Sequence, residues 1–445
     1  MQKRHYGLLT AITMITGIVI GSGIFFKADD ILVYTGGSTI LGIIVFCIAA
    51  FAIIFGSLTI SQLAMRTDRP GGIVTYAEDF VGMGAACAFG WFQVLLYLPA
   101  LCAVVSWVTG IYICQLFGWE GTVFKFTIVG FFVLVFLFVV NTLSARLGGI
   151  FQNATMFIKL IPLLLIAVLG LVFGNPGGMM AADAEAFKEA TRTAGWMTAF
   201  APIAFSLDGW IVSTSIGHEI KNSKRNFPIA LTVAPLVILV VYLLYFVGIS
   251  SLVGTETIMA EGNDSVFLAS TRIFGDFGAK MILIFVIVSV IGTVNGLVLG
   301  FIRMPYSLAI RGMIPGSKKM KKLETGVNAM PLNSAITAFL LSLFWLVINY
   351  ITQSMGMKGD VSEIAICISY LIYVVLYVAV IRLARKREIK GVFKGYIIPC
   401  LAIVGSFIIL TGSITHPLFP YYVLICLAVL AAGALYYRKN RESIH

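Results

Sequence analysis

Apolar segments long enough to cross a membrane recur along almost the whole chain, and they constrain its fold more than any other feature. A transmembrane helix needs about 20 consecutive apolar residues. Such segments lie near 7–33, 38–65, 81–115, 124–142, 148–173, 194–218, 226–253, 273–308, 331–350, 360–384, 396–413 and 419–437. A soluble core could not bury them, because 59% of the 445 residues are hydrophobic and only 11% are charged. The sequence therefore predicts an all-α protein of about twelve transmembrane helices, embedded in the lipid bilayer.

Basic residues concentrate in alternate loops between these segments. The basic loops carry Lys3, Arg4, Arg66, Arg69, Arg146, Lys221, Lys224, Arg225, Arg311, Lys318, Lys319, Lys321 and Lys322, with further bases at 382–394 and 438–441. The other loops carry mostly acids: Glu120, Asp183, Glu185, Glu256, Glu261, Asp264 and Asp360. By the positive-inside rule, both termini are expected on the cytoplasmic side of the plasma membrane. The formal charge of +11 follows from this asymmetry and predicts no nucleic-acid partner.

Three glycines, Gly17, Gly21 and Gly23, interrupt the first apolar segment. Each costs a helix about 0.5–1 kcal/mol relative to alanine, so an unbroken helix would not favour them. One interpretation is a break in the helix, which hydrocarbon tolerates only where the irregular backbone is buried in protein or lines a wet cavity. The other is close helix packing through small residues. Taken alone, this segment favours neither.

A second irregular stretch lies in the sixth segment, at 204–210, directly after Pro202. A separation of five segments turns the second unit upside down relative to the first, as in transporters built from inverted repeats. Two interrupted helices in corresponding positions favour true breaks over packing. The sequence therefore predicts a first repeat in 1–175, a second repeat in 190–390, and two further helices with a cytoplasmic end in 391–445.

Several motifs together resemble a known family. Gly-Ser-Gly-Ile-Phe at 21–25 resembles the first-helix motif of the amino acid–polyamine–organocation superfamily. The stretch 205–210, with His-Glu-Ile-Lys-Asn at 218–222 and Asn-Phe-Pro at 226–228, is similar to the sixth helix and following loop of the L-type amino acid transporter family. Gly-Trp-Phe-Gln at 90–93, Ile-Lys-Leu-Ile-Pro at 158–162 and Asn-Gly at 295–296 add to a likeness that is greatest with bacterial serine/threonine and alanine exchangers. The resemblance implies the leucine-transporter fold, with a five-plus-five inverted repeat and broken helices one and six, and sodium-independent amino acid exchange.

The helix breaks supply the groups that a zwitterionic amino acid needs. The outer half of the first helix is expected to begin near 22–24, where free amides and the positive dipole end attract a carboxylate. Backbone carbonyls at the ends of the preceding half-helices are expected to accept from the ammonium group. The predicted substrate-binding residues are Ile18, Gly21, Ser22, Gly23, Ile24, Phe205 and Asp208.

Three of these residues have alternative explanations. Ser22 is equally suited to cap the half-helix that follows it, and both roles are compatible. Phe205 resembles the family's aromatic lid over the substrate, with packing against lipid or protein as the alternative. Asp208 either caps the inner half of the sixth helix or contacts an amine.

Lys159 lies deep in the fifth apolar segment, where a charged lysine costs about 2.5–3.5 kcal/mol on insertion scales. It is expected to face the protein interior, and snorkelling toward the membrane surface is the alternative. In the family the matching lysine lies near the first-helix break, where sodium-coupled members of the fold hold a cation, so the resemblance implies a tethered substitute for sodium. Tyr242 matches a family tyrosine that cooperates with this lysine; ordinary packing is its alternative.

A secondary transporter of small neutral amino acids is the class that the sequence favours. A charged Lys159 favours exchange, whereas a lysine neutralised by burial would favour proton symport. A cationic amino acid or polyamine carrier would need an acid in the side-chain pocket, for which Asp208 is the candidate. The four histidines are far apart and the seven cysteines show no paired spacing, so no enzyme activity, metal or cofactor is expected. No cysteine before the fourth segment resembles the one that joins animal relatives to a heavy chain, so a stand-alone, bacterial subunit is expected.

Overall fold

The computed structural model describes residues 7–67, 69, 71–322, 331–357, 359–414 and 419–444. Within these ranges, the side chains of Ser22, Phe26, Ala145–Leu147, Gly149, Asn153, Ala182, Ser215–Glu219, Asn263, Ile364 and Ser443 are left out of the description. The described chain is helical and contains no strand. Eleven of its helices are long and apolar enough to cross a membrane. The twelfth predicted crossing, the sixth, is present as two short pieces, and neither of them reaches this length.

The crossings follow one another in the order that the apolar segments predict. The first five are α1 (Leu8–Val19) with α2 (Ser22–Phe26), α4 (Thr39–Ala64), α6 (Met83–Phe92) with η1 (Gln93–Tyr97) and α7 (Leu98–Phe117), α8 (Val123–Leu143), and α9 (Ala145–Phe173). The next five are α11 (Phe200–Ser206) with η3 (Trp210–Glu219), α12 (Ser223–Val253), α14 (Ser265–Ile310), α16 (Leu332–Ser354) and α17 (Glu363–Arg385). The last two are η5 (Phe393–Ile397) with α18 (Ile398–Ile414), and α19 (Phe419–Lys439).

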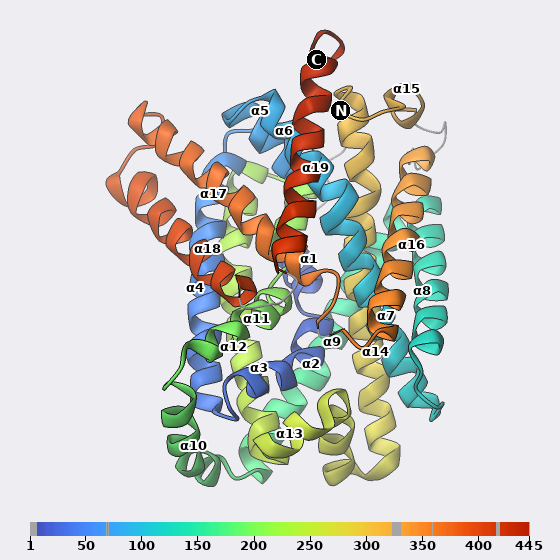
Figure 1. Ribbon diagram of the computed structural model, residues 1–445, viewed down its shortest axis with the longest axis vertical. Helices are drawn as coiled ribbons and strands as arrows, with labels where there is room; N and C mark the ends of the chain where they lie inside the picture. The colour runs from blue at the N-terminus through green and yellow to red at the C-terminus, as the bar shows by residue number, and fades with distance from the viewer. Residues whose placement is uncertain are drawn as a thin grey trace.

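Short helices in the connections lie at the two ends of the molecule (Figure 1). The end that we call the α3–α13 end carries α3 (Ala28–Tyr34), α10 (Pro176–Ala190) and α13 (Thr255–Glu261). α10 and α13 belong to the acidic loops, and α3 lies at the end of the first predicted apolar segment. The opposite, α5–α15 end carries α5 (Ile73–Phe80), α15 (Ser317–Met320) and the end of α19, which belong to the basic loops. The structure thus separates the two sets of loops that the charge pattern distinguishes. The remaining short turns are η2 (Ala194–Ala199), η4 (Gly262–Asp264) and η6 (Arg441–Ser443).

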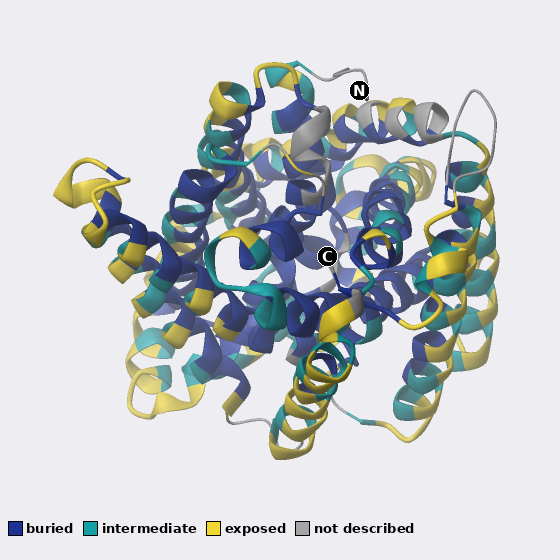
Figure 2. Ribbon diagram, turned by 90° about the horizontal axis from the view of Figure 1, so that it is seen from above, coloured by how far each residue is buried: buried dark blue, intermediate teal, exposed yellow. Residues whose placement is uncertain are grey.

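The two predicted helix breaks are confirmed. α1 ends at Val19, Ile20 is extended with ψ 108°, and α2 begins at Ser22. α11 ends at Ser206, and Gly209 adopts φ +95°, a left-handed conformation that favours glycine, before η3 begins. Both breaks lie among buried residues, which fill the centre of the molecule when it is viewed along its long axis (Figure 2). Irregular backbone at this depth is therefore enclosed by protein, as the membrane requires.

Asp183, on α10, ties a connecting helix to a crossing. The sequence places it in an acidic loop, but it is only 4% exposed. Its carboxylate accepts hydrogen bonds from Ser38 Oγ at 2.7 Å and from the Thr39 amide at 2.5 Å. A carboxylate at this position satisfies free N–H groups at the start of α4 and complements the helix dipole. The contact fixes α10 against the α3–α13 end of α4.

Candidate functional site

Lys159 of α9 reaches the break in the first helix. Its side chain is fully buried, and Nζ donates to the carbonyl oxygens of Gly17 at 2.6 Å and Ile20 at 2.5 Å. Thr293 Oγ1, on α14, lies 3.2 Å from the same nitrogen. These three oxygens match the three donors of an ammonium group. The last carbonyls of α1 have no partner within that helix, and the lysine supplies one.

Tyr242 of α12 bridges the two breaks. Its hydroxyl oxygen lies 2.9 Å from the Val19 carbonyl oxygen and 3.0 Å from that of Ser206, so the single hydroxyl proton can be donated to either. Val19 is the last residue of α1, and Ser206 is the last residue of α11. Lys159 and Tyr242 therefore hold different carbonyls of the same break, and Tyr242 also connects that break to the sixth crossing.

The glycines at the break also permit close packing, so the two interpretations of Gly21 and Gly23 are compatible. A Cβ atom at Gly21 would overlap Oγ1 of Thr293, and one at Gly23 would overlap Cα of Ser206. Glycine at these positions lets α2 approach both α14 and the end of α11. The helix break and the packing of its second half thus depend on the same residues.

A small cavity lies between the two breaks. It is lined by Ile18, Val19, Gly23, Leu101, Val105, Phe205, Asp208, Gly209, Thr293 and Leu297. Four of the seven predicted substrate-binding residues, Ile18, Gly23, Phe205 and Asp208, are among them. The cavity measures about 20 Å³, which is room for about one water molecule. Pockets that bind small molecules typically measure about 300–1,000 Å³, so this conformation is closed and must expand to admit an amino acid.

The remaining predicted binding residues lie at or next to this cavity. Gly21 and Ile24 are buried at the start of the second half-helix, but they are not among the lining residues. The side chain of Ser22 lies outside the described residues, although its backbone begins α2. The carbonyl of Phe205 accepts from the Asp208 amide at 3.2 Å.

Asp208 is buried at the second break and is held by a residue from another crossing. Its Oδ2 accepts a hydrogen bond from Tyr97 Oη at 2.6 Å. Tyr97 lies in η1, a π-helical turn between α6 and α7, and such turns are frequent at functional sites. Oδ1 of Asp208 is buried and has no hydrogen-bond partner among the described residues. An acceptor in this position beside the cavity is available to a ligand donor.

A charged cluster closes the site toward the α3–α13 end. Lys27 Nζ lies 2.6 Å from Glu363 Oε1, 3.3 Å from Asp360 Oδ2 and 3.4 Å from Asp30 Oδ2, and we call these four residues the Lys27 cluster. The lysine side chain is only 3% exposed. Its Nζ also lies 5.5 Å from the centre of the Phe205 ring, within the range of a cation–π contact. The cluster therefore covers the phenylalanine that lines the cavity.

Three carboxylates keep the buried Lys27 side chain positively charged. Burial lowers the pKa of Lys27, but the nearby Glu363, Asp360 and Asp30 outweigh it and hold that pKa well above its ordinary value. Lys27 is therefore a permanent cation, and it is the positive partner of three acids.

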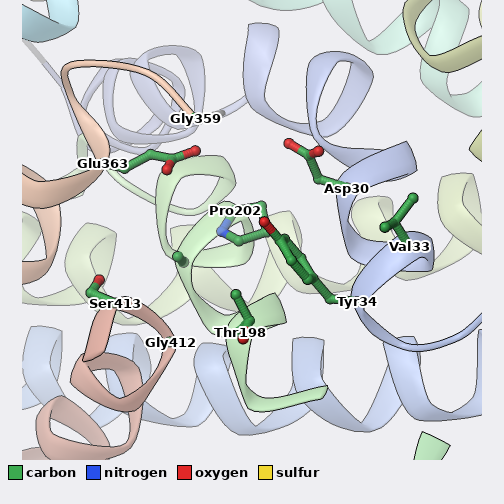
Figure 3. Close-up of a pocket in the computed structure, with 10 residues that line it drawn as sticks. Asp30, Val33, Tyr34, Thr198, Pro202, Gly359, Glu363, Gly412 and Ser413 are labelled. Atoms are coloured by element: carbon green, nitrogen blue, oxygen red, sulfur yellow. The ribbon is translucent and has the colours of Figure 1, made fainter. Parts of the chain in front are cut away.

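Asp30 and Glu363 of this cluster also line a pocket of about 290 Å³ (Figure 3). The carboxylates of Asp30 and Glu363 face each other across it, and Tyr34, Thr198 and Ser413 line its sides. Asp30 belongs to α3, which follows the first-helix break, and Glu363 begins α17. The cluster thus joins a segment of the broken helix to a separate crossing at the mouth of the pocket.

The α5–α15 end is closed by another buried cation, Arg311, at the end of α14. It donates to Glu78 Oε2 at 2.7 Å and to Thr75 Oγ1 at 2.8 Å, and both partners belong to α5. Arg311 is only 6% exposed, although the sequence assigns it to a basic loop. α5 also contacts η3, the second half of the sixth crossing. These bonds fix α5 across the end of the bundle.

Sequence reasoning missed Lys27, Tyr97 and the acids around Lys27. Lys27 could have been predicted from the sequence, because it directly follows the Phe-Phe pair of the first break and so must lie beside the site. Tyr97 and Glu363 had no such signal, since each is close to the site only through tertiary packing. In the described residues, no group of three or more His, Cys, Asp and Glu side chains is placed to hold a metal ion.

The fold and the paired breaks define a membrane transporter with the leucine-transporter fold. The solved structure of MhsT in complex with L-phenylalanine matches with a TM-score of 0.64 and 14% sequence identity, over 93% of this chain and 99% of that chain. The chain belongs to the amino acid permease family, whose sequence model matches residues 6–430.

Named relatives are similar along nearly the whole of this chain. The serine/threonine exchanger SteT of Bacillus subtilis (strain 168) is 29% identical, over 99% of this chain and 98% of its own. The b(0,+)-type amino acid transporter 1 of Mus musculus is 25% identical, over 98% and 87%. The Asc-type amino acid transporter 1 of Homo sapiens is 25% identical, over 94% and 79%. The predicted resemblance to amino acid exchangers is confirmed.

Proposed function

We propose that this amino acid permease exchanges small neutral amino acids across the plasma membrane by alternating access, without sodium. The observation that carries the proposal is the position of Lys159 Nζ, bonded to two carbonyls of the first break and next to Thr293. A sodium ion would need a set of oxygen ligands, and here the ammonium group of Lys159 contacts these oxygens instead. The names of the exchangers among its relatives support the same mode of transport.

The substrate would bind between the two breaks. Its carboxylate would accept from the free amides at the start of α2, where Gly23 lines the cavity. Its ammonium group would donate to the carbonyls of Ile18 and Phe205. Leu101, Val105 and Leu297 would surround a short apolar side chain. The cavity is too small for any amino acid, so the half-helices would have to move to admit one.

Alternating access would open one end of the site at a time. The Lys27 cluster would be the gate at the α3–α13 end, which the positive-inside rule places outside the cell. Arg311 and α5 would close the cytoplasmic end, on which both termini would lie. We propose that the chain works without a heavy chain, because Cys114, the last cysteine before the fourth crossing, is buried and forms no disulfide.

Sodium-independent exchange has a direct test. In proteoliposomes loaded with serine, threonine or alanine, we expect external labelled substrate to accumulate by counterflow, and empty liposomes to accumulate at most one tenth as much. Replacing sodium with choline should leave the rate unchanged, because Lys159 already occupies the oxygens next to the break. A rate that falls severalfold in choline would contradict the proposal, as would equal uptake by empty and loaded liposomes.

A cationic amino acid is the second candidate substrate, and the unpaired Oδ1 of Asp208 favours it. A carboxylate at the cavity wall would pair with a guanidinium or a side-chain ammonium. If so, Asp208→Asn should reduce arginine or lysine counterflow at least tenfold and change alanine counterflow less than twofold. If Asp208 instead only positions Tyr97, the variant should change both substrates alike. Tyr97→Phe is the control, since it removes the partner and keeps the carboxylate.

A further inference from the structure

An apolar groove runs between α8 and α16 on the outer flank of the bundle, where the two helices lie side by side (Figure 1). It is lined by Val135, Phe138, Val139, Thr142, Leu143, Leu332, Ala335, Ile336 and Phe339, and its volume is about 320 Å³. All but Thr142 of these side chains are apolar. Val139 is 51% exposed and Ile336 is 47% exposed, so the groove opens toward the membrane. Its shape and composition suit a hydrocarbon chain.

The groove ends beside a group of lysines. Leu143 is the last residue of α8 and Leu332 is the first residue of α16, so one end of the groove lies at the α5–α15 end of the molecule. Asn333 Nδ2, one residue beyond Leu332, donates to the Lys319 carbonyl at 3.0 Å. This bond fixes α15 next to the groove. The exposed lysines of α15 and its next two residues, which we call the α15 lysines, are Lys318, Lys319, Lys321 and Lys322.

The apolar groove and the neighbouring lysines together favour a ligand that has both a hydrocarbon chain and an anionic headgroup. A lysine close to a membrane surface attracts anionic lipid and contributes about fivefold in affinity. Lysine side chains are long and flexible, so their ammonium groups reach past the helix ends into the headgroup region. A neutral lipid would gain only the apolar contact, whereas an anionic phospholipid would gain both contacts.

We infer that this groove binds an anionic phospholipid of the inner leaflet, with an acyl chain between α8 and α16 and the phosphate at the α15 lysines. The site is distinct from the substrate cavity, since none of its lining residues lines that cavity. It lies between the fourth and ninth crossings, so an occupying lipid would contact two helices that are distant in sequence. The inference does not depend on which amino acid is transported.

Native mass spectrometry of the purified full chain tests the headgroup contact. Phosphatidylglycerol and phosphatidylcholine with identical acyl chains are offered in equal amounts, and the bound lipids are counted. We expect the wild type to retain phosphatidylglycerol at least tenfold better. The triple variant Lys318→Gln, Lys321→Gln, Lys322→Gln should lose this preference at least tenfold and retain phosphatidylcholine unchanged. Lys319 is kept because its backbone bonds Asn333.

A matched triple variant separates a specific site from general surface charge. Lys386→Gln, Lys390→Gln and Lys394→Gln remove the same charge from exposed residues of another basic loop, between α17 and α18. This control should retain phosphatidylglycerol like the wild type. Equal loss in the two triple variants would overturn the inference, and so would equal retention of the two lipids by the wild type.

Filling the groove tests the acyl-chain contact. Val139→Trp places a large side chain in the groove from its exposed wall, and it should reduce the retention of both lipids at least fivefold. Val347→Trp is the control, since Val347 is 55% exposed on α16 and lies outside the groove. If Val139→Trp does not yield folded protein, Ile336→Trp makes the same test from the opposite wall. A filled groove that retains both lipids as well as the control would overturn the inference.

Discussion

Lys159→Ala should reduce amino acid exchange at least tenfold while reducing the yield of folded protein much less. The substitution removes one donor from each of the carbonyls of Gly17 and Ile20, and the Ile20 carbonyl keeps a second donor, the Thr293 hydroxyl at 3.3 Å. A buried acceptor left without a donor costs about 1–3 kcal/mol. This cost falls on the break between α1 and α2, whereas most of the core is untouched. The measurement is substrate exchange in proteoliposomes, normalised to the folded fraction from size-exclusion chromatography.

The same experiment distinguishes a fixed cation from a proton carrier. Exchange and net uptake are measured with and without an imposed pH gradient, for wild type and Lys159→Ala. A fixed cation predicts that the gradient drives no accumulation in either protein. Gradient-driven accumulation by the wild type that disappears in the variant would instead establish proton symport. Lys280→Ala, at an exposed lysine of α14, is the control and should exchange like the wild type. An unimpaired Lys159→Ala protein would refute any central role for this residue.

The fold could be predicted because membranes allow few solutions. Apolar segments of about 20 residues must become helices, and loop charge sorts them by side. The breaks were predictable for a similar reason: glycines at 17, 21 and 23, and the irregular stretch at 204–210, do not suit continuous helices. The sequence did not predict which residues pack against these glycines: Gly21 makes room for Thr293, and Gly23 makes room for Ser206. That requirement arises from helices distant in sequence. The repeat boundaries at 175 and 190 remain predictions.

Part of the candidate site could be predicted, and the rest arises from tertiary packing. A lysine deep in an apolar segment must find acceptors, so the inward position of Lys159 followed from the cost of burying its charge. The family resemblance placed its ammonium group near the first-helix break, but it did not indicate the carbonyls of Gly17 and Ile20 in particular. Glu363 and Tyr97 were not predicted, because an acid near a helix start and a tyrosine in an apolar segment are both common. Only the structure places one beside Lys27 and the other beside Asp208.

Lys27→Met should reduce exchange at least tenfold if the Lys27 cluster is the proposed gate at the α3–α13 end. The substitution removes the only positive charge of the Lys27 cluster and leaves Asp30, Asp360 and Glu363 facing one another. Removing one partner of a buried ion pair typically costs about 3–5 kcal/mol, because the remaining charge stays buried without compensation. The closed conformation bears this cost, whereas opening returns the carboxylates to water. The measurements are exchange in proteoliposomes and the thermal midpoint of the purified protein, and substrate binding should persist while exchange falls.

Two further variants separate the gate from a general effect of charge. Lys27→Met combined with Glu363→Gln removes one of the opposing carboxylates. The double variant should therefore exchange at least three times as fast as Lys27→Met alone. Lys125→Met is the matched control at the same end of the molecule. Its side chain is 43% exposed and lies 3.9 Å from a Glu120 that is 87% exposed, and surface pairs of this kind contribute about 0–1 kcal/mol. Lys125→Met should therefore exchange like the wild type. If Lys27→Met also does so, the Lys27 cluster is not a gate. If the double variant is as impaired as Lys27→Met alone, repulsion among the carboxylates is not the cause of the loss. The loss of the cation–π contact between Lys27 and Phe205 would then explain the result.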